Sequence, residues 1–182
     1  MKNRSILALI AVAGLSACAT QGGSSMAPFS QAGLPDAVQV PAGHNVAMQT
    51  MASGDITYQC RVKKDMAGQF EWVFVGPDAG LNDRRGKRVG KYYGPPATWE
   101  SLDGSRVSGA QVAVAPAGAG RIPLQLVKAN PAMGMGAMQG VSYIQRVNTQ
   151  GGVAPASPCD VATLDQKQTV KYTADYIFWR AL

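Results

Sequence analysis

The stretch Asp55–Val75, "DITYQCRVKKDMAGQFEWVFV", decides the fold class. In "DITYQCRV" apolar residues take every second place, which is the period of a strand with one buried face. After the turn sequence "KKDMAG", the run "QFEWVFV" places three aromatic side chains on one face: Phe70, Trp72 and Phe74. Two such runs joined by a short turn predict an antiparallel β-hairpin.

The same period recurs along the rest of the chain, with Gly, Pro and Asp turn signals between the runs. Five more strands are expected: "KRVGKYY" (87–93), "SRVSGAQVAVA" (105–115), "IPLQLVKA" (122–129), "VSYIQRVNT" (141–149) and "TVKYTADYIFW" (169–179). No stretch keeps apolar residues at helical spacing for three turns. We therefore expect an all-β chain, with a single β-sandwich or barrel-like domain of about seven or eight strands over residues 55–182.

The N-terminus, "MKNRSILALIAVAGLSACAT", has the order of a secretory signal: basic residues, an apolar run and small residues. Leu15 to Cys18 resemble the lipobox of bacterial lipoproteins, which predicts a signal peptide over residues 1–17 and a lipid on the Cys18 thiol. Ala17 and Ala19 also form an A-x-A site, so plain secretion stays open. Ala19, in place of Asp, favours the outer membrane. Residues 18–54, rich in Gly, Ser, Ala, Pro and Gln, are expected to form a flexible tether.

Two cysteines remain after Cys18, namely Cys60 and Cys159. An even pair in an oxidising compartment predicts a disulfide, which would clip the C-terminal part of the chain to an early strand.

The expected mature chain has only a mild excess of basic residues. Lys2 and Arg4 lie in the signal peptide, so the rest of the chain has 15 of the 17 basic residues and 11 acidic ones. This mild excess, in an exported protein, argues against nucleic acid as a partner.

Three groups of residues are candidates for a site. Tyr92 and Tyr93, with Trp99 and Glu100, flank two prolines and could form a stacking surface for sugars or extended peptides; equally, the aromatic rings could fill the end of the domain. Glu71 and Glu100 are the only glutamates, and a glycosidase would need two facing carboxylates.

The third group is a run of three thioethers, Met133, Met135 and Met138, whose spacing suits Cu(I) in exported copper carriers. His44 is the only histidine and falls in the expected tether, which leaves no catalytic triad and no Cys/His cluster for zinc. The glycine-rich run from Gly134 to Gly140 departs from a dinucleotide-binding fingerprint, so we expect no cofactor.

Several motifs carry a family resemblance: "YQC", "FEWVFVGPDAGLND", "TWESLDGSRV" and "YIQRVNTQGGVAP", followed by Cys159. They resemble an exported bacterial and fungal family known as domain of unknown function 3455, over most of Asp55 to Trp179. The resemblance implies a secreted or periplasmic single domain with no established activity. The chain departs from the family pattern at Tyr92, near the place of a histidine, and at Leu124, in the place of a tryptophan.

These observations favour a non-enzymatic lipoprotein, anchored in the outer membrane through its N-terminal lipid, whose β domain binds an envelope polysaccharide or a partner protein. Two alternatives stay open. One is a carbohydrate-active enzyme that uses Glu71 and Glu100, and the other is a periplasmic Cu(I) carrier that uses the methionine-rich loop.

The intact mass of the protein extracted from its native envelope tests the leader and the cysteine pairing together. We expect a mass raised by acyl groups on Cys18, and two thiols that react with a label only after reduction. An unmodified mass with two free thiols would contradict both expectations, and the compartment argument would be lost with them.

Overall fold

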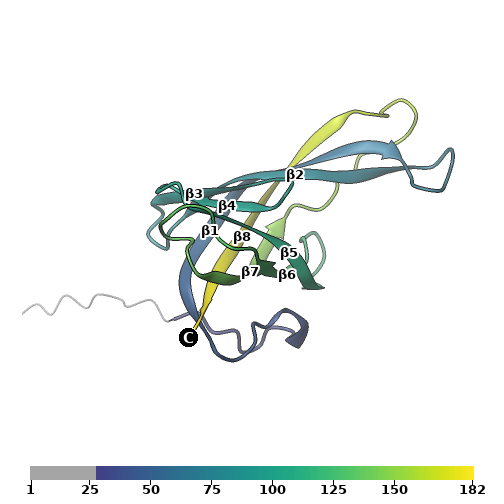
Figure 1. The fold of residues 1–182 in the computed structure, drawn as a ribbon. Helices are drawn as coiled ribbons and strands as arrows, with labels where there is room; N and C mark the ends of the chain where they lie inside the picture. Colours follow the sequence, from purple (N-terminus) through teal and green to yellow (C-terminus); the bar gives the residue numbers. More distant parts are fainter. Residues whose placement is uncertain (1–27) are drawn as a thin grey trace, which may run out of the picture.

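The computed structural model describes residues 28–182, in which eight antiparallel strands form one closed barrel (Figure 1). Each strand pairs with the next in the chain, and β8 returns to pair with β1. The strands are β1 (His44–Val62), β2 (Phe70–Asn82), β3 (Arg88–Tyr93), β4 (Thr98–Ser101), β5 (Arg106–Ala115), β6 (Leu124–Ala129), β7 (Val141–Gly151) and β8 (Lys167–Ala181). Within the described residues, no helix has the length and apolar character that a membrane crossing requires.

The predicted all-β class is confirmed, and the hairpin of β1 and β2 forms as expected. Cys60 pairs with Trp72, and Val62 pairs with Phe70 beside the turn. A barrel forms, in place of a sandwich, because β1 also pairs with β8 from His44 to Gln59. This second ladder gives the sheet no free edge, which protects it from pairing with other chains.

The barrel interior is filled by side chains that alternate along each strand. On β8 the inward residues are Tyr172, Ala174, Tyr176 and Phe178, none more than 3% exposed. The strand predicted over residues 169–179 is therefore confirmed. They pack with Trp99 of β4 and with inward side chains of the other strands into one core. An eight-stranded barrel is just wide enough for such filling or for one small ligand.

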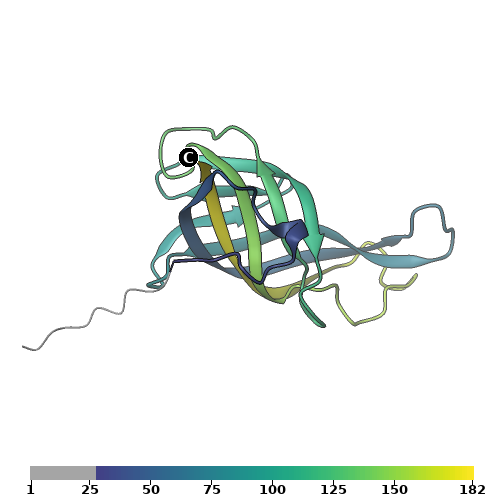
Figure 2. The ribbon, with the colours of Figure 1, turned by 90° about the horizontal axis from the view of Figure 1, so that it is seen from below.

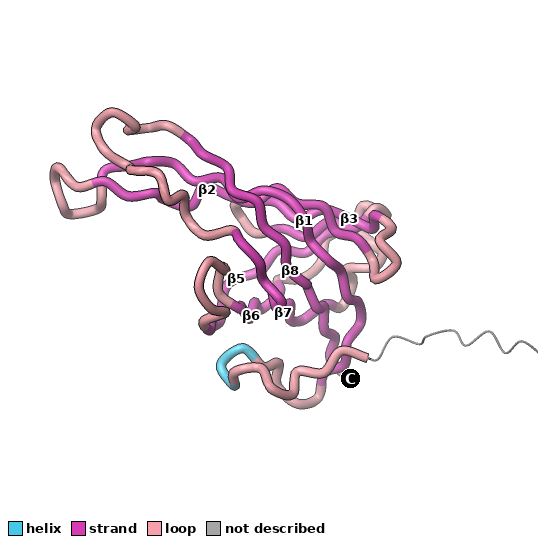
Figure 3. Tube along the Cα trace, turned by 180° about the vertical axis from the view of Figure 1, so that it is seen from behind, coloured by secondary structure: helices cyan, strands magenta, loops and turns pink. Residues whose placement is uncertain are grey.

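The predicted tether over residues 18–54 is wrong for its second half. β1 begins at His44, and the chain before it crosses the outside of the barrel (Figure 2). This segment, residues 28–43, contains the 3-10 helix η1 (Asp36–Val38), which lies beside the barrel wall in Figure 3. The first part of β1 was not recognised as a strand because many of its residues are small or polar. At Gly54 a larger residue does not fit, because an added Cβ would meet the Ala79 backbone on β2.

The outer segment covers an apolar face formed by β5, β6, β7 and β8. Val38 and Val40 are buried against Val147, Ile177 and other side chains of this face. A buried amide joins the layers: the Nε2 atom of Gln145 donates to the Val38 carbonyl at 2.7 Å, and its Oε1 atom accepts the Trp179 indole N–H at 2.8 Å. The segment is thus an integral part of the domain, which starts well before residue 55. Residues 1–17 and Cys18 lie outside the described residues.

The short strand β4 was not among the expected strands. It has only four residues and follows two prolines, yet Trp99 pairs with Tyr92 on one side and with Val107 on the other. Its connection to β5 is a tight turn at Asp103 and Gly104, where Gly104 adopts φ 85°. This strand supplies the largest side chain that is fully buried, Trp99.

One end of the barrel is closed by the loop of residues 130–140 between β6 and β7. Met138 of this loop is inserted into the core and is 1% exposed. The Asp103 carboxylate holds the loop, because it accepts hydrogen bonds from the Ala137 amide at 2.8 Å and from the Ser105 hydroxyl at 2.6 Å. Hydrogen bonds from the Ser105 hydroxyl and then the Ala137 and Ser105 amides lower the pKa of Asp103 to about 2.

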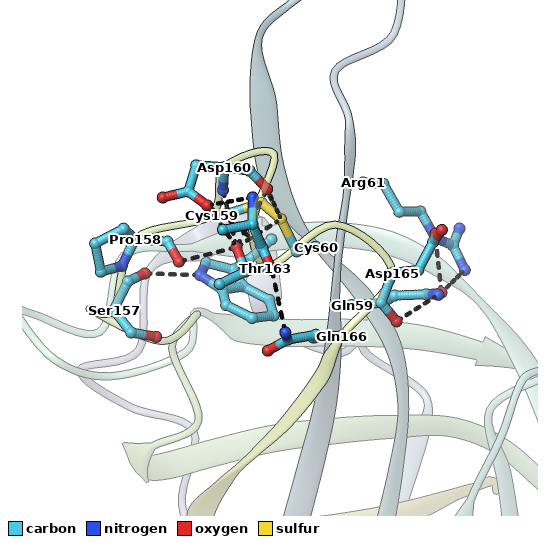
Figure 4. The surroundings of a disulfide bond; sticks show 12 residues. Gln59, Cys60, Arg61, Ser157, Pro158, Cys159, Asp160, Thr163, Asp165 and Gln166 are labelled. Carbon is cyan, nitrogen blue, oxygen red and sulfur yellow. Dashed lines mark hydrogen bonds between the residues drawn. A yellow bond between two sulfur atoms is a disulfide. The ribbon is translucent and has the colours of Figure 1, made fainter.

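At the other end, β1, β2 and β8 extend past the barrel as an arm (Figure 1). The predicted disulfide between Cys60 and Cys159 is confirmed, with Cα atoms 5.4 Å apart, and it joins β1 to the β7–β8 loop (Figure 4). Around it, the Trp72 indole donates to the Ser157 carbonyl at 2.9 Å, and the Cys60 amide donates to Gln166. A disulfide of this kind is compatible with an exported protein.

Replacement Asp103→Asn should destabilise the protein at neutral pH. Because folding lowers this pKa from 3.8 to about 2, the carboxylate stabilises the fold fully above about pH 4, and the contribution is lost as the pH falls toward 2. Urea midpoints of the wild type and the variant should therefore differ at pH 7 and converge near pH 2. Asp65→Asn, in an exposed turn, is the matched control. An equal effect there would contradict the stabilising role of the Asp103 hydrogen bonds to the loop of residues 130–140.

Loss of the disulfide should cost about 2–5 kcal/mol of unfolding free energy, because the bond closes a loop of roughly 100 residues in the unfolded chain. The double replacement of Cys60 and Cys159 by Ser avoids a lone thiol. We expect a lower urea midpoint for it than for the oxidised wild type, and a midpoint close to that of the reduced wild type. Equal midpoints for the oxidised protein and the double variant would contradict this assignment of stability.

Candidate functional site

A cavity of about 360 Å³ opens at the end of the barrel from which the arm extends. This volume lies within the usual range for small-molecule sites, about 300–1,000 Å³. Its lining comes from β1, β2, β3, β5, β6 and β7 and from the loops at that end: Ile56, Tyr58, Phe74, Pro77, Tyr92, Gly94, Pro95, Ala97, Gly109, Gln111, Ile122, Pro123, Gln125, Val127 and Arg146. Most of these side chains are apolar, and one of them is charged.

The rim of the cavity is shaped by one close approach of two backbone segments and by one hydrogen bond. Gly76 of β2 lies against the β3–β4 loop, where an added Cβ would meet the Gly94 carbonyl. On the opposite side, the Tyr58 hydroxyl donates to the Gly152 carbonyl at 2.7 Å and so fixes the start of the β7–β8 loop to β1. These contacts hold the mouth in shape without a ligand.

The floor of the cavity is a cluster of aromatic rings. Tyr92 lines the cavity and stacks on Trp99 with centroids 4.7 Å apart. Behind them, the Tyr176 ring lies 4.9 Å from Tyr92 and 5.5 Å from Trp99. Burial raises the pKa of Tyr92 and of Tyr176. Both hydroxyls are therefore neutral at physiological pH and act as hydrogen-bonding groups.

Arg146 of β7 brings the only charge into the lining. It pairs with Gln125 on β6 and with Tyr176 on β8. Its Nε and Nη2 atoms donate to the Pro123 carbonyl at 3.2 Å and 3.0 Å. Its positive charge also lowers the pKa of Tyr58, Tyr92 and Tyr176, against the larger effect of burial.

The candidate ligand patch is divided by the sheet. Tyr92 and Trp99 point into the barrel, whereas Tyr93 and Glu100 lie on the outside. There, Glu100 accepts a hydrogen bond from the Tyr93 hydroxyl at 2.7 Å and pairs with Lys91 at 3.2 Å. The Tyr93 hydrogen bond, and then Lys91, lower the pKa of Glu100. The four residues therefore do not form one surface: two are core, and only Tyr92 among the four lines the cavity.

The two glutamates are far apart. Glu100 pairs with Lys91, which pairs with Gly80 on β2, while Glu71 lies near the opposite end of β2, against Arg61. At about 3.3 Å per residue, the separation along β2 is about 30 Å. A glycosidase needs its carboxyl groups within about 5–10 Å, and its general acid needs a raised pKa. The arrangement does not meet the distance requirement, and the pKa of Glu100 is lowered, which is the opposite of what a general acid needs.

The three methionines are not gathered either. Met138 is buried in the core, whereas Met133 is 58% and Met135 is 77% exposed. His44 belongs to β1, with its ring 5.0 Å from that of Tyr143, and not to a tether. Among residues 28–182, no cluster of three or more His, Cys, Asp or Glu side chains could hold a metal ion.

Sequence reasoning missed the residue that gives the cavity its charge. The signal was present in "VSYIQRVNT": on a strand, Arg146 has the same parity as the buried Ile144, so a guanidinium falls on the inward face. A charged residue at an inward position is a functional hint, because an unpaired charge is costly to bury.

Comparison with known proteins identifies the family of this chain but indicates no activity. A family model described as "Protein of unknown function (DUF3455)" matches residues 41–180. No curated protein and no solved structure matches the chain. The matched range begins just before β1 and ends within β8, so it spans the whole barrel. The chain therefore belongs to the family of proteins of unknown function DUF3455, as its motifs predicted.

Proposed function

We propose that this protein is an exported, non-enzymatic binding protein that takes a small, largely apolar molecule into the mouth of its barrel. The observation that carries the proposal is the cavity of about 360 Å³ at the open end, with aromatic and aliphatic walls. Barrel mouths are a common place for such sites, and eight strands leave room for one small ligand.

The composition of the lining supports binding over catalysis. It contains no Asp, Glu, His, Cys, Ser or Lys side chain, so it offers no general base and no strong nucleophile. Its polar groups are two glutamine amides, tyrosine hydroxyls and one guanidinium. Groups of these kinds orient a ligand by hydrogen bonds while the apolar walls supply most of the affinity.

The position of the cavity supports an anchored carrier or receptor. The described chain starts beside the closed end of the barrel, where Phe29 contacts Trp179 near the end of β8 with ring centroids 6.2 Å apart. The cavity opens at the other end, among the β1–β2, β3–β4, β5–β6 and β7–β8 connections. A lipid on Cys18 would thus hold the protein from the side opposite the mouth. On this proposal the envelope component expected as a partner is a small molecule.

Filling the cavity tests the proposal. Ala97 lines the mouth and packs against the core, so Ala97→Trp should occupy the space in which the ligand lies. We expect the neutral fluorescent probe N-phenyl-1-naphthylamine to bind the wild type, and to bind this variant about tenfold more weakly or less, as measured by fluorescence titration.

The matched control is Ala110→Trp, which adds the same side chain at an exposed position on β5 beside the lining residues Gly109 and Gln111. Its probe affinity should stay within about twofold of the wild type. Absence of probe binding to the folded wild type, or equal losses in both variants, would refute the mouth as a binding site.

A further inference from the structure

We propose that the ligand of the barrel mouth carries one anionic oxygen group, bound by the free edge of the Arg146 guanidinium, with its apolar body along the aromatic wall. This inference rests on the proposed function and names the ligand class. It predicts a compact amphiphile with a carboxylate or a phosphate at one end.

The first support is the geometry of the guanidinium. The Nε and Nη2 atoms of Arg146 both donate to the Pro123 carbonyl, which fixes the plane of the group and uses one edge of it. The edge formed by Nη1 and the second N–H of Nη2 has no partner within residues 28–182. Two parallel N–H groups are the arrangement that binds a carboxylate or a phosphate in a bidentate manner.

The second support is the lack of a counter-charge. Lys91 pairs with Glu100 and Lys171 pairs with Asp55, both at the surface, and Arg146 takes part in neither ion pair. Within the cavity lining, Arg146 meets only neutral polar groups, namely the Gln111 and Gln125 amides and the tyrosine hydroxyls. The Asp78 carboxylate, whose charge also acts on Tyr172, is exposed on β2 and is not part of the lining. A cation that is partly removed from water without an anion is costly, and an anionic ligand group would offset this cost.

The third support is a pair of buried hydroxyls close to the same charge. The Tyr172 and Tyr176 hydroxyls are buried beside each other and interact mutually, although neither has a partner with full hydrogen-bond geometry in the described structure. Both are near enough to Arg146 for its charge to act on their pKa, and Tyr176 lies directly behind Tyr92, which lines the cavity. These hydroxyls are not part of the cavity lining, so they contribute neutral polarity behind the aromatic floor and do not themselves contact the ligand.

The rest of the lining limits the remainder of the ligand. Ile56, Phe74, Pro95, Ile122 and Val127 surround the space and offer no polar side-chain atom. The volume is near the lower end of the range for small-molecule sites, so one short alkyl chain or ring system fits, and a two-chain lipid does not. The anionic group would therefore lie at one end of a single apolar body.

Displacement of N-phenyl-1-naphthylamine by octanoate, octyl phosphate and octan-1-ol, at neutral pH, tests the inference. These compounds each contain eight carbon atoms in one unbranched chain and differ in the head group. We expect octanoate or octyl phosphate to bind the wild type at least about tenfold more tightly than octan-1-ol. The tighter of the two identifies the head group as carboxylate or phosphate.

In Arg146→Met the affinity for the tighter anion should fall to about that for octan-1-ol, which should itself change less than about twofold. Retained octan-1-ol binding shows that the variant is folded. Arg121→Met removes an equal charge from an exposed position in the β5–β6 connection and should leave all affinities unchanged.

Octan-1-ol binding as tight as both anions, or an Arg146→Met variant that keeps anion selectivity, would overturn the inference and leave the proposed function in place. Failure of the probe and all three alkyl compounds to bind the folded wild type would overturn the proposed function as well.

Discussion

The pairing of β1 with β8 is the constraint on which the rest of the structure depends. It runs from His44 to Gln59 on one side and from Lys167 to Ala181 on the other, and it closes the sheet. Closure fixes which side chains lie inside, because every strand must then alternate in step with its neighbours. The same two strands continue past the barrel, where the disulfide of Cys60 joins them to the β7–β8 loop. Closure, core and arm are therefore one continuous ladder.

The interior is packed unevenly along the barrel axis, and this unevenness makes the cavity. Trp99, Tyr176, Phe178 and the inserted Met138 fill the closed end and the centre without exposure above about 1%. Toward the open end, small residues such as Gly109 and Ala97 line the interior, and the rings of Phe74 and Tyr92 form part of the cavity lining. The aromatic cluster thus serves both as hydrophobic core and as the floor of the site. Core stability and ligand shape are set by the same side chains.

The sequence predicted the features that depend on local alternation and missed those that depend on tertiary context. The hairpin after Asp55, the inward face of β8 and the cysteine pair follow from period and count. The start of β1 was missed because small residues such as Gly54, which allow close packing against β2, hide the alternating apolar pattern of a strand. The split of Tyr92 from Tyr93 was available from strand parity alone. An inward-facing residue can line a cavity or pack in the core. Which of the two occurs depends on the strands across the barrel, and the sequence alone does not give their arrangement in space.

The departure from the family pattern at Tyr92 bears on how this member holds a ligand. Tyr92 lies on the cavity wall, stacked on Trp99 and close to Arg146. An imidazole there would bring a group that titrates near neutral pH, whereas burial raises the pKa of the phenol and keeps it neutral. Arg146 therefore remains the only charged side chain in the lining of the cavity. A change at this position would alter the polarity of the cavity wall without removing the charge of Arg146.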